Sequence, residues 1–366
     1  EAADVLVFLA AMMVISALAE LAGVFDWVAL RIAARAGGSV FRLFLLIYGF
    51  GAVLTAFFSL DVTVIVLTPI VFAMCSRFAL PPVPFLIICT FVANIPSLVF
   101  PMSNLTNLLL YAEFKIAFTD FVAVMVVPNT VALICLIAIT WLLFRTHLPA
   151  RFSEPAHPEA PAINTMWLRT AAIVLILTLL GIIGLGVVGA PLSIAAAIGA
   201  VVLQVLGWRQ HAIAIAEVSH RIAWPVLPFV VAMLVLVDTV NRNTLSHLDW
   251  SYPNGMLAGT AMATGAAVLG SNIVNNVPMT LLAVPFIHQS DPAASDRLAY
   301  ATLIGANIGP TLTTYGSLAT LLWLSIVRRR GVGISTGQYM RHAWIVTLPV
   351  LGAALASLWL ALWVIG

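Results

Sequence analysis

Charged residues are scarce in this sequence. Asp, Glu, Lys and Arg together make up 8% of its 366 residues, whereas a soluble globular domain carries about a quarter. Hydrophobic residues make up 62%, and the mean hydropathy is +1.10. The scarcity of charge excludes a soluble fold. The formal net charge of +2 gives no indication of a nucleic-acid partner, so we expect none.

Cysteine is also scarce, and the motifs of metal sites are missing. The three cysteines, Cys75, Cys89 and Cys135, lie in apolar segments without CxxC spacing, so the sequence gives no sign of a disulfide framework. The seven histidines show no HExxH spacing, and no predicted span carries a pair of aspartates. We therefore expect neither an enzyme nor a metal or cofactor site.

Apolar stretches recur along the whole sequence. About ten of them approach the roughly 20 residues that a spanning helix needs. They do not alternate as the strands of a membrane barrel would. The sequence therefore predicts an all-α polytopic membrane protein, embedded in a lipid bilayer. Uninterrupted scaffold spans are expected at residues 4–24, 118–144, 170–188, 191–208, 222–241 and 343–365.

The two halves of the sequence repeat each other. The only long polar stretch, which is rich in proline and mixed charge, predicts a cytoplasmic linker over residues 147–168. It separates a first repeat at 1–146 from a second at 169–366. Without a gap, ANIPSLVFPMSNLTNLLL aligns with ANIGPTLTTYGSLATLLW, so that Asn94 meets Asn307.

The arginines predict that these repeats are inverted. Nearly all of the 16 basic residues can be placed on one side, which the positive-inside rule assigns to the cytoplasm. For this assignment to hold, 42–79 and 255–289 must be re-entrant hairpins of opposite orientation. Broken transmembrane helices are expected at 84–113 and 298–327. Two spans of the second repeat, over 170–208, have no counterpart before Asp4, so we expect that the first repeat lacks an N-terminal pair of helices.

Polar residues in the middle of apolar segments mark the candidate site. They are costly there, because freed backbone groups find no water in the hydrocarbon region. Packing between helices is one explanation for such residues. The other is a midplane binding site formed by hairpin tips and broken helices. Asp61, the one carboxylate placed deep in a hairpin, is the candidate for proton or cation coupling. The candidate binding residues are Asp61, Asn94, Ser103, Asn104, Asn107, Asn275, Asn276, Asn307, Thr313, Ser317 and Thr320.

The sequence resembles the bacterial arsenite efflux permeases of the ArsB family, within the ion transporter superfamily. The resemblance is most specific at GANIGPTLTTYGSLATLLW, residues 305–323, and is supported by VNNVPMTLL at 274–282 and DVTVIVLTPIVFAM at 61–74. It implies a multi-pass protein of the bacterial inner membrane that exports arsenite and antimonite, coupled to protons. It also implies a soluble arsenite-stimulated ATPase as a partner. The chain differs from the family pattern at Leu60, Asn94 and Asn307, where the family commonly has Asn, Asp and Asp.

Two transport functions fit these patterns. Export of arsenite is the first, since its neutral trihydroxide can be bound by amides and hydroxyls, whereas a trithiolate site would need clustered cysteines. The alternative is a sodium/proton antiporter or another anion transporter of the same superfamily. A carboxylate dianion would call for Arg or helix N-termini at the midplane. No Arg is expected there, which disfavours carboxylates.

Overall fold

The computed structural model describes residues 2–152, 164–210, 215–222, 224, 226–243 and 250–365. In these residues almost every element is a helix, and the one extended pairing is an isolated bridge between Ser39 and Arg151. The predicted all-α membrane fold is confirmed. Residues 153–163, the middle of the predicted linker, lie outside the described part of the chain.

Eight of the described helices are long and apolar enough to cross a membrane. They are α1 (Ala2–Leu21), α3 (Val40–Phe58), α4 (Leu60–Arg77), α7 (Phe118–Phe144), α8 (Thr165–Val187), α9 (Leu192–Arg209), α12 (Met256–Val274) and α16 (Thr336–Ile365). The other α-helices are α2 (Val24–Ala36), α5 (Pro82–Asn94), α6 (Leu105–Glu113), α10 (Ile215–Arg221), α11 (Val226–Asn243), α13 (Asn276–His288), α14 (Ser295–Ile308) and α15 (Leu318–Arg329).

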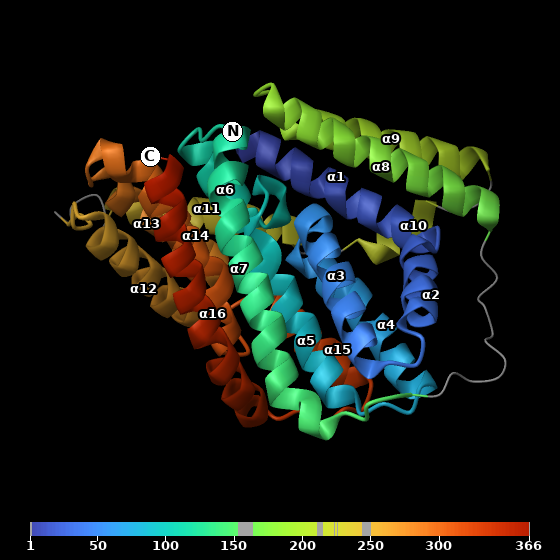
Figure 1. The fold of residues 1–366 in the computed structure, drawn as a ribbon. Coiled ribbons are helices and arrows are strands. Elements are labelled where there is room, and N and C mark those ends of the chain that lie inside the picture. The colour runs from blue at the N-terminus through green and yellow to red at the C-terminus, as the bar shows by residue number, and fades with distance from the viewer. Residues whose placement is uncertain are drawn as a thin grey trace.

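Helices α1, α8 and α9 form one side of the molecule (Figure 1), and α1 packs along α9. The approach of α8 to α9 depends on Gly199, because a Cβ atom there would lie 2.2 Å from the Thr178 hydroxyl. Small residues allow membrane helices to pack this closely. These three helices therefore form a tightly packed group, and α1 is the member that faces the rest of the chain.

The remaining long helices pack into a second group, in which α16 lies along α7 and α12 lies along α14 (Figure 1). A Cβ atom at Gly305 of α14 would lie 2.4 Å from the Thr264 carbonyl oxygen of α12. Larger side chains are excluded at that contact. Helices α12 and α14, which come from different predicted units of the second half, are thus held in direct contact.

Each half contains one helix pair with a sharp tip and one interrupted helix. The pairs are α3–α4, joined at Ser59, and α12–α13, joined at Asn275. The interrupted helices are α5–α6, broken by the 3₁₀ turns η1 (Ile95–Leu98) and η2 (Pro101–Ser103), and α14–α15, broken by η6 (Gly309–Leu312). Proline occupies the first turn of each 3₁₀ segment, where its missing N–H leaves no donor unpaired. The inverted orientation of the two halves stays a prediction.

Candidate functional site

The tips of the two helix pairs share an unusual backbone conformation. Ser59 has φ 83° and ψ 163°, and Asn275 has φ 79° and ψ 158°. This region of φ and ψ is occupied almost only by glycine, and each other residue held there costs about 1–3 kcal/mol. Two residues with a side chain adopt it at corresponding points of the two halves. The tips are therefore strained and must be held by their surroundings.

The first tip is held by hydroxyl groups. Thr63 donates a hydrogen bond to the Ser59 carbonyl oxygen at 2.8 Å, and Thr55 donates to the Val92 carbonyl oxygen at 2.9 Å. Ser103, in the break between α5 and α6, donates to the Ala56 carbonyl oxygen at 2.9 Å. These bonds join the tip of α3–α4 to the interrupted helix of the same half.

The second helical piece of each interrupted helix begins with a polar N-cap. The Asn104 side chain accepts from the Thr106 backbone N–H at 3.3 Å, and Ser317 accepts from the Thr320 N–H at 3.2 Å. Such caps satisfy backbone donors that a helix start leaves free. Both cap residues are buried. The sequence alignment had placed Asn104 opposite Ser317, and the structure gives the two residues the same local role.

Asn307 joins the two halves at a buried amide cluster, formed with Asn104, Thr106 and Asn107. Its Oδ1 accepts from Asn104 Nδ2 at 2.8 Å and from the Thr106 hydroxyl at 2.6 Å. Its Nδ2 donates to Asn107 Oδ1 at 2.6 Å. Asn107 in turn donates to the carbonyl oxygens of Ser97 and Phe100, at 2.7 and 2.9 Å. The unwound backbone of the first half is thus linked, through Asn107, to α14 of the second half.

The tip of α12–α13 contacts the unwound backbone of its own half. Asn275 donates to the Tyr315 carbonyl oxygen at 3.2 Å, and the Asn276 backbone N–H donates to the Gly316 carbonyl oxygen at 3.1 Å.

Asn272, one helical turn before the tip, contacts the same break. Its side chain donates to the Gly309 carbonyl oxygen at 2.8 Å and accepts from the Thr313 hydroxyl at 2.7 Å. The carbonyl groups that the break exposes are therefore bound by the amides of the neighbouring tip.

A chain of hydroxyls links the two interrupted helices a second time. The hydroxyls of Ser317 and Thr320 lie 3.0 Å apart, and those of Thr320 and Thr90 lie 3.2 Å apart. All three side chains are fully buried. Hydroxyls can donate and accept, so such a chain can change its direction without moving heavy atoms.

Asn94 and Asp61, two of the predicted site residues outside the amide cluster, each have a side-chain oxygen without a partner among the described residues. Asn94 donates to the Thr90 carbonyl oxygen of its own helix at 2.8 Å, and its Oδ1 is buried without a hydrogen-bond partner among the described residues. Asp61, in the first turn of α4, faces α1, where it lines a small cavity with Ser16 and Glu20. Its Oδ1 is likewise shielded and unpartnered in the part of the chain that the structure describes. Asp61 and the amide cluster therefore lie at different places around the first tip.

Three residues of this region were missed by the sequence analysis: Thr90, Thr106 and Asn272. Thr106 aligns with Ala319, so the comparison of the two repeats gave it no weight. Asn272 comes one helical turn before the tip residue Asn275 and faces the same break, a position that helical spacing alone could have indicated. Thr90 stands in a continuous apolar segment and gave no local signal.

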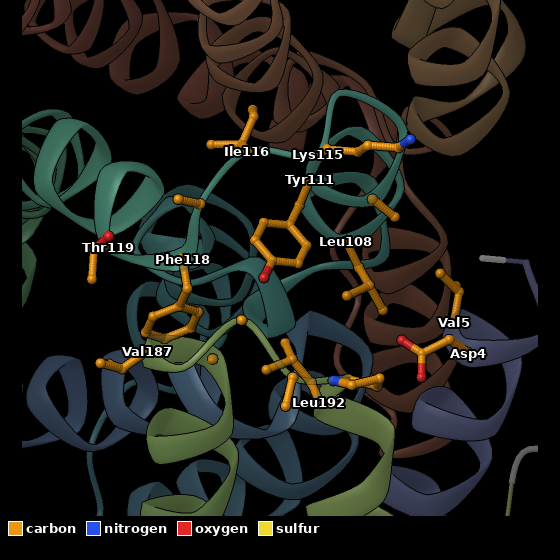
Figure 2. Close-up of a pocket in the computed structure, with 16 residues that line it drawn as sticks. Asp4, Val5, Leu108, Tyr111, Lys115, Ile116, Phe118, Thr119, Val187 and Leu192 are labelled. Atoms are coloured by element: carbon orange, nitrogen blue, oxygen red, sulfur yellow. The ribbon is translucent and has the colours of Figure 1, made fainter.

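Four cavities lie in series along α1. The first, called the outer cavity after the predicted orientation of the chain, has a volume of about 540 Å³ and lies between the start of α1, the end of α6 and the turn between α8 and α9. Figure 2 shows Asp4, Tyr111 and Lys115 on its wall. At the other end of α1 lies the inner vestibule, of about 430 Å³, lined by Glu20, Asp26, Asn164, Trp167 and Arg221 among others.

Two much smaller cavities lie between these large ones. The Asn104 cavity has a volume of about 30 Å³, and the Asp61 cavity has about 50 Å³. Ser59 and Val62 line both, so the two meet at the first tip. Leu108 is shared by the outer cavity and the Asn104 cavity. Spaces of a few tens of Å³ admit only a few water molecules. The series is therefore wide at both ends and narrow at the tip of α3–α4.

The whole chain matches a known protein family. The family model described as arsenical pump membrane protein matches residues 2–364. An arsenical pump membrane protein of Escherichia coli is 33% identical over 368 residues, which cover 96% of this chain and 85% of that protein. An uncharacterized transporter of Mycobacterium tuberculosis is 26% identical over 376 residues, covering 99% of this chain and 87% of that protein.

The fold also resembles a solved structure. The YdaH transporter of Alcanivorax borkumensis, described as having an unusual topology, aligns with a TM-score of 0.54 over 98% of this chain and 84% of that chain. The two sequences are 14% identical. At this identity the likeness concerns the fold alone.

Proposed function

Because the chain belongs to the family of arsenical pump membrane proteins, we propose that it exports arsenite, and antimonite, from the bacterial cytoplasm by secondary active transport. The family and the eight described helices that are long and apolar enough to cross a membrane make it a multi-pass inner-membrane transporter of arsenical resistance. The proposal adds the substrate, the direction of transport and the coupling to protons.

The observation that carries the proposal is the buried amide cluster of Asn104, Asn107 and Asn307 with Thr106. At neutral pH arsenite is a small neutral trihydroxide, which needs both hydrogen-bond donors and acceptors. Amide and hydroxyl groups supply both. In the structure these groups bond to one another. Exchange of those bonds for bonds to the trihydroxide would bind it without burying a charge, which would be costly at this depth.

Thiolates are not needed for this substrate site. Cys75, Cys89 and Cys135 lie on α4, α5 and α7, and Cys75 and Cys89 are buried. Among the described residues no three His, Cys, Asp or Glu side chains come together closely enough to bind one ion. A trithiolate arsenic site would require such a group. The arrangement therefore favours hydroxyl and amide ligands.

Asp61 is proposed to couple transport to protons. It is the carboxylate at the first tip, and its Oδ1 has no partner among the described side chains that would fix its charge. A carboxylate in this position can take up a proton on one side and release it on the other as the tip moves. Asn94 and Asn307 cannot do so. A single carboxylate is consistent with exchange of one proton for one neutral substrate molecule.

Arsenite uptake into everted membrane vesicles tests the proposal. We expect accumulation when a proton gradient, acid inside, is imposed, and none after its collapse by an ionophore. Accumulation that follows a sodium gradient instead would favour the antiporter of the same superfamily. Accumulation that requires ATP and an added soluble ATPase would assign the energy source to that partner. Vesicles without the protein provide the control.

A further inference from the structure

The inner vestibule carries charges that the proposed function has not used. Glu20 at the end of α1 and Arg221 at the end of α10 form an ion pair. Asp26 of α2 lines the same vestibule. Burial raises the pKa of Asp26, and the charge of Arg221 opposes this rise. The Arg221 guanidinium therefore acts on two carboxylates at this end of α1.

The ion pair lies where the inner vestibule meets the Asp61 cavity. Glu20 and Arg221 line both spaces, together with Ile65 and Val66. Behind the pair, on the Asp61 side, Ser16 is 7% exposed. The side chains of Arg221 and Glu20 are 45% and 32% exposed. The pair is thus partly exposed and lies on the boundary between the two spaces.

Unpartnered polar groups lie on both sides of the pair. Trp167, which lines the inner vestibule, is 2% exposed, and its Nε1 has no hydrogen-bond partner among the residues described. Asp61 Oδ1 is the corresponding group in the Asp61 cavity. Buried polar groups in proteins are nearly always hydrogen-bonded. A buried donor beside the vestibule and a buried acceptor beyond the pair are therefore both available to a polar ligand once they are uncovered.

Resting on the proposed function, we propose that the inner vestibule is a loading site for the neutral trihydroxide of arsenic, and that the Glu20–Arg221 ion pair closes the way from it to Asp61. The vestibule lies at the arginine-rich end of α1, the side predicted to be cytoplasmic. Its carboxylates accept from the substrate hydroxyls, and Arg221 and Trp167 donate to them. The Asp61 cavity of about 50 Å³ has room for only a few water molecules, so the pair must part before the larger substrate enters.

The gate is tested by thiol labelling in everted vesicles, which does not depend on arsenite. The three native cysteines are replaced by alanine, and Ser16→Cys reports on the space behind the pair. Ile70→Cys, which lines the vestibule and not the Asp61 cavity, is the matched reporter in front of the pair. Two impermeant methanethiosulfonates, one anionic and one cationic, are used, so that a change in local charge is distinguished from opening.

We expect slow labelling of Ser16→Cys and fast labelling of Ile70→Cys. Adding Arg221→Gln should raise the Ser16→Cys rate about fivefold with both reagents, the size expected for loss of a half-exposed ion pair. Arg209→Gln, at the end of α9, should leave it unchanged. The exchange Glu20→Arg with Arg221→Glu should restore slow labelling. Equal rates for the two reporters in the starting protein, or no change with Arg221→Gln, would overturn the gate.

The loading site is tested by transport and by protection. Arsenite should slow the labelling of Ile70→Cys, and Trp167→Phe should raise the arsenite concentration at half-maximal transport while the maximal rate stays the same. Absence of protection by arsenite in a protein that transports it overturns the loading site. If the starting protein transports no arsenite in either gradient, the proposed function fails, while the labelling rates still decide on the gate.

Discussion

At single residues, the contact between the two halves depends on the amide of Asn307. Its oxygen accepts two hydrogen bonds and its nitrogen donates one, all to the stretch from Asn104 to Asn107. An aspartate could accept the first two but could not donate the third. The amide thus satisfies a cluster of neutral groups without introducing a charge. This explains how an uncharged Asn is accommodated at position 307.

Asn307→Ala should destabilise the protein and abolish arsenite export. Three buried polar side chains would lose their partner, which costs about 1–3 kcal/mol of the free energy of unfolding. Thermal unfolding in detergent and arsenite uptake into vesicles are the measurements. Asn129→Ala is the matched control, because Asn129 accepts from the Leu98 N–H of the same break at 3.2 Å but lies outside the cluster. If Asn129→Ala has the same Tm as Asn307→Ala and also loses transport, the role of Asn307 is merely structural.

Asp61→Asn should remove coupling and leave exchange. Asn keeps the shape of the side chain but cannot take up or release a proton. Uptake driven by an imposed pH gradient should vanish, whereas exchange of labelled for unlabelled arsenite at equilibrium, which needs no net proton movement, should survive. Asp120→Asn, an exposed carboxylate in the first turn of α7 that lines none of the four cavities, should retain gradient-driven uptake. Gradient-driven uptake at the original rate in Asp61→Asn would place the coupling group elsewhere, with Glu20 and Glu113 next to test.

At the level of elements, both helix pairs store strain at their tips. Ser59 and Asn275 adopt a conformation that suits glycine, although neither is glycine. Asn275 recovers part of the cost through its bond to the Tyr315 carbonyl oxygen, whereas Ser59 makes no side-chain capping bond. Backbone strain of this kind clusters at active sites, ligand clamps and switch regions. The two tips are the points where each half should change shape most easily.

Ser59→Gly should stabilise the protein and slow transport. Glycine adopts the tip conformation without penalty, so the free energy of unfolding should rise by about 1 kcal/mol, while the resting tip loses its tendency to move. Ala79→Gly is the control, since Ala79 also has positive φ, of 50°, but lies in the turn after α4. It should raise the Tm and leave transport unchanged. A Ser59→Gly protein that is more stable and equally fast would show that the strain has no part in transport.

At the scale of the whole molecule, the positions of the three cysteines decide whether they could form an arsenic site. Cys75, Cys89 and Cys135 stand on three different helices, and none of them lines any of the four cavities along α1. A soft trithiolate site would need them to meet. The polar side chains on their largely apolar walls are instead carboxylate, amide, hydroxyl, ammonium, guanidinium and ring groups.

A cysteine-free protein should therefore export arsenite. Replacement of all three cysteines by Ala or Ser is expected to leave resistance of the host and uptake into vesicles within about twofold of the starting protein, since substitutions away from a site have small effects. Membrane levels are measured by immunoblot. Loss of uptake at a normal membrane level would show that thiols bind the substrate.

The sequence by itself determined the membrane fold and the points where its helices break. Length, apolar composition and polar residues inside apolar segments act locally, and each is visible without any knowledge of distant contacts. The breaks at Ser59, Asn275, Asn104 and Ser317 all fall within the polar clusters of the sequence. The two halves could be matched from the sequence as well, because their aligned motifs are local stretches of residues.

Only the tertiary structure decided which polar groups meet. Asn307 bonds to Asn104 and Asn107 about 200 residues away, and such pairing depends on the packing of whole helices, which no local pattern encodes. For the same reason Asp61, adjacent in sequence to the first tip, faces α1 and the Glu20–Arg221 pair, and not the amides. The chemistry of each residue is local, whereas its partner is set by how the helices pack.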